Sequence, residues 1–235
     1  MLLPVSGISE AVPIDPDAVG IVGHSEGALI AATLVSMSQD VNFIVMIGGP
    51  GINHCDLIVL QNCAIARSRG MSESDLEIFH SWIERYHYIL KDEKNDAVAK
   101  EKLHSLFANM TEDEKRVVTV KESAIDQDLS PWFREFIAGD PQPILRKVTC
   151  PVLALNGSKD VQVTSRENLK GIEESLRAGG NTRFTVIEMP NLNHVLQTAE
   201  TGSVDEYKTI EETMAVTALE TITQWLHEIK VDKFP

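Results

Sequence analysis

The sequence predicts an α/β fold in which a parallel sheet carries helices on both faces and a helical segment interrupts the sheet. Three observations lead to this prediction. Short apolar runs typical of buried strands alternate with helical segments towards both ends of the chain. Residues 52–140, which lie between them, carry helical signals and no clear strand. The 235 residues, 43% of them hydrophobic and 24% charged, have an ordinary globular composition.

The first sheet elements follow a turn-rich stretch at residues 12–16. Residues 18–23 form a nearly unbroken apolar run, which suits a strand buried on both faces. The apolar, alanine-rich residues 28–35 favour a buried helix. A second apolar run at residues 41–47 ends in glycines and a proline, so it predicts a second strand that ends in a turn.

A helical insertion is predicted over residues 52–140. Ser72–Asp75 and Thr111–Glu114 each resemble a capping box, in which side chains satisfy the free amides of a helix start. Between them, aromatic and apolar residues recur at helical spacing, namely Phe79, Trp82, Ile83, Tyr86, Ile89 and Leu90. We therefore expect a core made of residues 1–51 and 141–235, with a helical cap inserted between its two parts.

The strand pattern resumes at residues 152–155 and returns at residues 184–187. A helix rich in Glu, Leu and Arg is predicted between them, from Ser165 to Ala178. The last helix carries one apolar face, made of Ala218, Leu219, Ile222, Trp225, Leu226 and Ile229. This alternation of strands and helices predicts parallel strand pairing.

Charge and cysteine content restrict the partners. The formal net charge of −14 disfavours nucleic acid and anionic membrane surfaces as partners. Cys55, Cys63 and Cys150 form no Cys-x-x-Cys pair, so we expect free thiols and neither a zinc site nor a disulfide framework. Residues 1–7 lack the basic and apolar regions of a signal peptide. We expect a cytoplasmic protein, or a secreted or periplasmic parent if a signal peptide was lost.

One motif carries nucleophile chemistry. Gly23-His24-Ser25-Glu26-Gly27 follows the first predicted strand and opens the first predicted helix. In that context Gly-x-Ser-x-Gly is typical of a sharp turn that strains Ser25 and exposes its hydroxyl, while the glycines relieve crowding. The Glu26 amide would then face a developing oxyanion at a helix N-terminus. The alternative is an ordinary strand-to-helix turn.

A serine nucleophile needs a base and an orienting acid. Asp160 follows the predicted strand at residues 152–155, and His194 lies in the loop after the next strand. The order Ser, acid, His is the one expected when a nucleophile occupies this kind of turn. We therefore predict a triad of Ser25, His194 and Asp160. The alternatives are a turn aspartate and a hydrogen-bonded loop histidine.

These segments resemble the α/β-hydrolase superfamily. Ile14–Gly27 resembles its nucleophile elbow, Cys150–Asp160 its acid-bearing strand and loop, and Leu192–His194 its histidine loop. Within the superfamily the chain is most similar to bacterial esterases and prolyl-oligopeptidase-like hydrolases with a helical cap, whose return to the core resembles Ser130–Phe133 with Asp140-Pro141 downstream. The resemblance implies hydrolysis of an ester or related acyl bond, without a cofactor or a metal.

The resemblance also implies missing parts. In the family the elbow follows the fifth of eight strands, whereas 22 residues precede Gly23 here. We therefore expect the C-terminal portion of an α/β-hydrolase sheet, without the loop that supplies a second oxyanion donor. Losing such a donor costs about 10²–10³ in rate. An unpaired first strand would leave an apolar edge through which a homo-oligomer could form.

Three hypotheses for the function follow. The first is a serine hydrolase that cleaves a carboxylic ester through an acyl-enzyme, with a small acyl ester or a peptide as substrate. The second is a peptidase or thioesterase with the same triad. The third is an inactive fragment or association module. His80, Glu84 and His87 share a helical face, which we interpret as solvated rather than metal-binding. Asp126 and Asp128 are reserve candidates for the acid, but they lie inside the insertion.

Overall fold

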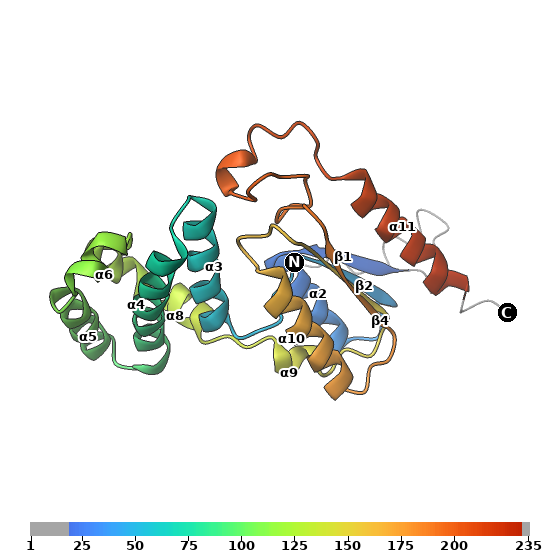
Figure 1. Ribbon diagram of the computed structural model, residues 1–235. Coiled ribbons are helices and arrows are strands. Elements are labelled where there is room, and N and C mark those ends of the chain that lie inside the picture. The colour runs from blue at the N-terminus through green and yellow to red at the C-terminus, as the bar shows by residue number, and fades with distance from the viewer. Residues whose placement is uncertain (1–18, 232–235) are drawn as a thin grey trace.

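The computed structural model describes residues 19–231, with side chains as far as residue 229. The predicted lead-in at residues 12–16, the predicted strand start at Ala18 and the predicted core residues 232–235 lie outside the described residues. In the described part, one parallel sheet is flanked by helices, which confirms the predicted α/β class (Figure 1).

The sheet has four strands in the described part, arranged in the order in which they occur in the chain. They are β1 (Gly20–His24), β2 (Phe43–Ile47), β3 (Val152–Gly157) and β4 (Phe184–Met189). All neighbours are parallel. Because parallel strands end at the same edge, the loops after His24, Ile47, Gly157 and Met189 share that edge, where α/β sheets bind ligands.

Helices cover both faces of the sheet. On one face lie α2 (Glu26–Met37), α9 (Gln142–Leu145) and α10 (Ser165–Ala178), and on the other lies α11 (Val216–Val231) (Figure 1). Successive strand residues point to opposite faces, so each strand contributes to both layers. The first layer buries Ile44, Met46, Val152 and Ala154, and the second buries Val45, Ile47, Leu153 and Leu155.

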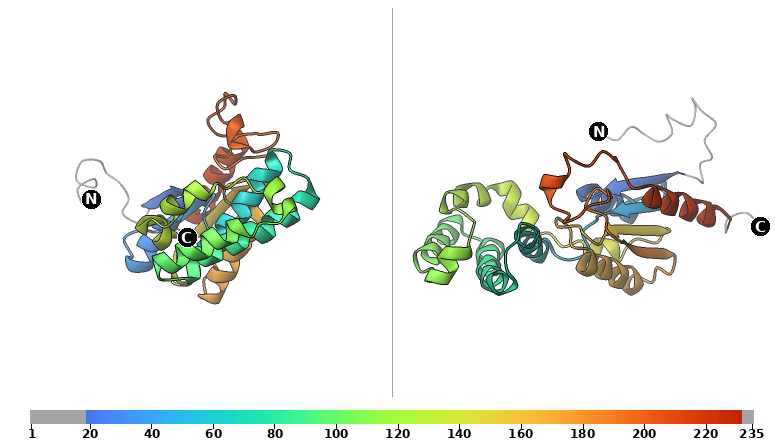
Figure 2. Two further views of the ribbon diagram at one scale, coloured as in Figure 1. Left: turned by 90° about the vertical axis from the view of Figure 1, so that its left-hand side faces the viewer. Right: turned by 45° about the horizontal axis from the view of Figure 1, so that its top comes forward.

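The chain between β2 and α9 forms a group of helices with its own hydrophobic core, here called the helical cluster (Figure 2). Its elements are α3 (His54–Ser68), α4 (Glu73–Asp92), α5 (Asp96–Ala108), α6 (Glu112–Val117), the 3₁₀ helix η2 (Glu122–Ala124), α7 (Ile125–Asp128) and α8 (Pro131–Ile137). Phe79, Trp82, Ile83, Tyr86 and Leu90 of α4 are buried in that core. The predicted apolar face of this helix is therefore present, while the boundaries of core and insertion stay a prediction.

Local signals account for two helix starts in the cluster. Thr111 and Glu114 form a complete capping box at α6, and Ser72 accepts a hydrogen bond from the Asp75 amide at α4. A second 3₁₀ helix, η3 (Val204–Glu206), lies between β4 and α11. None of the helices within residues 19–231 has both the length and the apolar composition that a membrane crossing requires.

Within the described residues, β1 pairs on one side only, with β2. Val22 is 58% exposed, so the prediction of a strand buried on both faces is wrong at this position. The physical reason is that α11 does not cover β1: the hydrophobic layer beneath this helix contains residues of β2 and β3 but none of β1. The neighbouring helix α2 exposes Ile30 and Met37.

Candidate active site

Ser25 lies in the turn between β1 and α2 with a backbone φ of 56° and ψ of −123°. A non-glycine residue in such a region carries about 1–3 kcal/mol of strain and keeps it only where its surroundings enforce it. Here the Ser25 amide donates to the Ile47 carbonyl at 2.8 Å, and the Ser25 carbonyl accepts from the Ala28 amide at 3.0 Å. The strained turn predicted from the sequence is therefore present. The Ser25 hydroxyl has no hydrogen-bond partner within residues 19–231.

The two glycines of the turn differ in their surroundings. A Cβ at Gly23 would lie 2.2 Å from the Gly27 carbonyl oxygen, so β1 and α2 can approach this closely only with a glycine there. A Cβ at Gly27 would meet no atom of the described residues within 4 Å. The expected crowding is therefore found at Gly23, and the same explanation is wrong for Gly27.

The Glu26 amide is the first of the 12-residue helix α2. None of the hydrogen bonds in the described part of the chain uses this amide as a donor. It lies at the positive end of the helix dipole, where negative charge is favoured. The amide is thus free to donate to an anionic oxygen beside Ser25.

His194 and Asp160 are in direct contact. The His194 Nδ1 donates to Asp160 Oδ2 at 2.7 Å, and the two side chains are 4% and 0% exposed. The other carboxylate oxygen, Oδ1, accepts from the Gln162 and Val163 amides at 2.8 Å each. Because Nδ1 carries the proton in this contact, Nε2 of His194 keeps a lone pair and can accept a proton.

The His194 loop is held by Asn193, which is fully buried. Its Oδ1 accepts from the Val195 amide at 3.1 Å and the Gln197 amide at 2.9 Å. Asn191 and Leu196 adopt positive φ values of 61° and 60° on either side of the histidine. Asparagine often organises turns in this way, and that signal could have singled out Asn193 from the sequence.

Gly48 connects the turn of Ser25 to the imidazole of His194. It follows Ile47, whose carbonyl binds the Ser25 amide, and its own amide donates to Leu155 at 2.8 Å. A Cβ at Gly48 would lie 3.0 Å from Cε1 and Nδ1 of His194 and 3.4 Å from Asp160 Oδ2. Sequence reasoning treated Gly48 only as part of a turn and missed this role, although its φ of 55° explains the glycine.

His24 makes a second connection between these segments. Its Nε2 donates to the His194 carbonyl at 2.9 Å, and the two rings lie 4.6 Å apart at 51°. The predicted residues therefore lie at the same carboxyl edge of the sheet, with His194 and Asp160 bonded after β4 and β3 and Ser25 after β1, which β2 separates from β3. No hydrogen bond within the described residues joins the Ser25 hydroxyl to His194, a contact that often tightens only when substrate binds.

Of the three residues expected on a solvated face of α4, only His87 differs from the expectation. His80 and Glu84 are exposed, but His87 is only 5% exposed and its Nδ1 donates to the Ile83 carbonyl. Phe133 of α8 covers the imidazole, and burial lowers the pKa of His87. Within residues 19–231, no cluster of three His, Cys, Asp or Glu side chains is arranged to hold a metal ion.

The other candidate acids and nucleophiles have separate roles in the helical cluster. Asp128 accepts from the Tyr86 hydroxyl at 2.6 Å, and Asp126 pairs with Lys100. Burial raises the pKa of the Cys55 thiol to about 12 and that of Cys63 to about 11, so both remain protonated near neutral pH. Both are free and buried as expected, whereas Cys150 is free and half-buried.

Comparison with protein families matches residues 11–113 to the family described as BAAT/acyl-CoA thioester hydrolase C terminal. The match includes Ser25 and the first part of the helical cluster. It covers less than half of the chain and ends before Asp160 and His194. A comparison with curated proteins found no match.

Among solved structures, the chain is similar to a proposed non-haem bromoperoxidase of Mycobacterium tuberculosis, with 14% identity and a TM-score of 0.43 over 96% of this chain and 72% of that chain. An esterase of Pyrococcus furiosus has 13% identity and a TM-score of 0.43, with 95% and 58% covered. An acylaminoacyl peptidase of Pyrococcus horikoshii has 14% identity and a TM-score of 0.40, with 81% and 22% covered. The chain thus spans 58% of the esterase and 22% of the peptidase.

Proposed function

We propose that the chain is an α/β-hydrolase, namely a serine hydrolase that cleaves acyl esters or thioesters with Ser25, His194 and Asp160. The observation that carries the proposal is the 2.7 Å contact between buried His194 and Asp160 beside a strained serine turn. Strain at a non-glycine residue next to an oriented imidazole is costly to maintain, so it is typical of functional sites.

In the proposed mechanism, Ser25 Oγ attacks the acyl carbonyl carbon while its proton passes to His194 Nε2. The carbonyl oxygen becomes an oxyanion, and the Glu26 amide donates a hydrogen bond to it. The tetrahedral intermediate collapses, the bond to the alcohol or thiol leaving group breaks, and His194 returns the proton to that group. An acyl ester on Ser25 remains.

Water then hydrolyses the acyl-enzyme by the same steps in reverse order. His194 Nε2 removes a proton from water, the hydroxide attacks the acyl-enzyme, and the proton is returned to Ser25 as the carboxylic acid leaves. Asp160 remains ionised and holds the imidazole with Nε2 towards the serine. Its two backbone hydrogen bonds from Gln162 and Val163 fix the carboxylate, so the orientation does not depend on His194 alone.

The family match favours a thioester of coenzyme A (CoA) as the substrate, since that family is described by acyl-CoA thioester hydrolysis. A carboxylic ester is the second candidate, because the elbow and histidine segments resemble esterases and the same steps apply. A peptide is the third. It requires protonation of a much poorer leaving group, for which His194 is the only acid we assign.

The experiment compares hydrolysis of acyl-CoA thioesters, p-nitrophenyl esters and short peptides by the wild-type chain and Ser25→Ala. We expect Ser25→Ala to lower kcat by at least about 10³-fold on the preferred substrate. Ser81→Ala, at an exposed serine of α4, is the control and should leave kcat unchanged. Equal rates for the wild type and Ser25→Ala would overturn the proposal and favour an inactive or association role.

A further inference from the structure

A cavity of about 280 Å³ lies between α3 of the helical cluster, the loop after β3 and the start of α10. Asp160 belongs to its lining and also binds His194, so the cavity adjoins the proposed active site. Three basic residues from three segments line it, namely Arg67, Lys159 and Arg166. The chain as a whole has 35 acidic and only 21 basic residues, so this concentration of positive charge is unusual for it.

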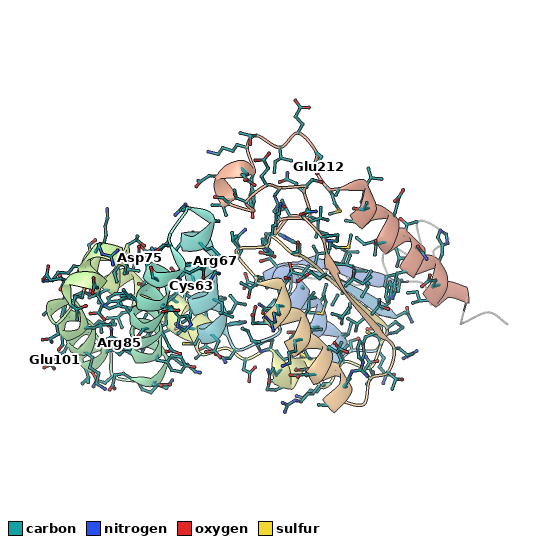
Figure 3. The ribbon with its side chains drawn as sticks, in the orientation of Figure 1. Cys63, Arg67, Asp75, Arg85, Glu101 and Glu212 are labelled. Carbon is teal, nitrogen blue, oxygen red and sulfur yellow. The ribbon has the colours of Figure 1, made fainter. Side chains whose placement is uncertain are left out.

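The three cations differ in how far they are already engaged. Arg67, labelled on α3 in Figure 3, makes two hydrogen bonds of 2.9 Å to Glu73. Lys159 donates from Nζ to the Ala199 carbonyl at 2.7 Å. Arg166 has no hydrogen bond or ion pair with any residue between 19 and 231, and its side chain is exposed. Arg166 is therefore the cation most available to a ligand.

The start of α10 adds backbone donors to the same cavity. This 14-residue helix has no side-chain cap. Thr164, at the N-cap position, has a buried Oγ1 with no hydrogen-bond partner in the described residues, and the Ser165 hydroxyl donates instead to Glu188 at 2.5 Å. The first amides of α10 therefore lack the acceptor that a helix start normally has, and an anion can supply it.

We propose that this cavity binds the phosphate groups of a CoA thioester, with Arg166 and the first amides of α10 as the principal donors. This inference rests on the proposed hydrolase function and identifies the part of the substrate that lies outside the acyl pocket. Arginine and helix N-termini are both preferred partners of phosphate oxygens. Because Asp160 lines the cavity and also contacts His194, a phosphate bound here lies near the proposed triad.

Two acidic residues, Asp160 and Glu167, also line the cavity, and Glu167 allows a sharper test. Glu167 lies in the first turn of α10 and lines the cavity, so its carboxylate repels a bound phosphate. Glu167→Gln should therefore tighten CoA binding, whereas Arg166→Gln should weaken it about tenfold, the effect of one charge-assisted hydrogen bond. Arg177→Gln removes the same charge at the other end of α10, where Arg177 pairs with Glu173, and should change nothing.

The experiment measures CoA binding by calorimetry and KM for an acyl-CoA and for the matching acyl-pantetheine, which lacks the phosphates. We expect Arg166→Gln to raise Kd for CoA and KM for acyl-CoA about tenfold, with KM for acyl-pantetheine and for a p-nitrophenyl ester unchanged. Inorganic phosphate should compete with CoA in the wild type more strongly than in Arg166→Gln.

Two outcomes separate this inference from the proposed function. If Ser25-dependent ester hydrolysis is present but CoA does not bind, or Arg166→Gln and Arg177→Gln have equal effects, the phosphate site is wrong and the hydrolase stands. If CoA binds in an Arg166-dependent way but Ser25→Ala leaves turnover unchanged, the hydrolase is wrong and the phosphate site stands.

Discussion

Replacing Asp160 by Asn tests how the site orients its imidazole. Asp160 uses Oδ1 for the Gln162 and Val163 amides and Oδ2 for His194 Nδ1, at 2.8, 2.8 and 2.7 Å. Asparagine has the same shape but only one acceptor oxygen. If that oxygen keeps the two amides, its NH₂ group faces His194 and requires Nδ1 to accept. Nε2 then carries the proton and cannot take one from Ser25.

The expected loss in kcat follows from the change of tautomer. A wrong tautomer in a serine triad lowers kcat by about 10⁴-fold, which corresponds to about 5.4 kcal/mol in the activation free energy at 1.36 kcal/mol per tenfold step. The free energy of unfolding should fall much less, by about 1–3 kcal/mol, because the two backbone hydrogen bonds survive and only the charge-assisted one is replaced. Catalysis and folding are therefore affected to different extents.

Steady-state hydrolysis of the preferred substrate measures kcat, and thermal unfolding checks that the Asp160→Asn variant is folded. Asp140→Asn is the control, since Asp140 is an exposed carboxylate that also accepts a backbone amide two residues on. It should retain the wild-type kcat. A folded Asp160→Asn variant with kcat within tenfold of the wild type would refute the orienting role of Asp160.

Four further predictions follow from the described contacts. Gly48→Ala places a Cβ 3.0 Å from the His194 ring at a φ of 55°, so we expect kcat to fall about 10²-fold and the free energy of unfolding by about 1–2 kcal/mol, measured by assay and by urea unfolding. His24→Phe removes the hydrogen bond to the His194 carbonyl while keeping a ring, and should lower stability by about 0.5–1.5 kcal/mol and lower kcat; an unchanged kcat would show that this bond is not needed. Burial lowers the pKa of His87, so at acidic pH the unfolded chain takes up a proton that the folded chain does not. The free energy of unfolding is therefore unaffected by this group above about pH 6.5 and decreases as the pH falls towards the lowered pKa. Urea unfolding at pH 7.5 and 5.5 should show a smaller decrease in the free energy of unfolding for His87→Phe than for the wild type. Thr111→Ala breaks the capping box of α6 and should lower the free energy of unfolding by about 0.5–2 kcal/mol, again by urea unfolding.

Local sequence patterns were sufficient for the four strands and for α2, α10 and α11, but not for the separate helices between β2 and β3. The predicted helix from Ser165 to Ala178 has the same bounds in the structure, because it begins after a turn and ends at Gly179-Gly180. The chemistry-bearing segments were also recognisable, since a buried strand followed by a polar loop marks the carboxyl edge of a parallel sheet. The catalytic roles of Ser25, Asp160 and His194 remain predictions that the geometry supports.

Features that depend on contacts between distant segments could not be predicted. The sequence assigns His87 to a polar face of its helix together with His80 and Glu84, whereas the structure buries its ring near Phe133 of α8. Val22 belongs to an apolar run, yet α11 does not cover it. Gly48 carries no motif of its own, and its place against His194 follows from strand register and from a loop more than a hundred residues away. Spacing along the chain contains none of this information.

The central claim, that Ser25 is the nucleophile, is tested most directly by labelling the folded chain with a fluorophosphonate and mapping the adduct by peptide mass spectrometry. We predict one adduct per chain, on Ser25, and its loss in Ser25→Ala. Labelling should be strongly slowed in His194→Gln, because the hydroxyl then lacks its base. A folded chain that forms no adduct, or forms it at another residue, would contradict the assignment of Ser25.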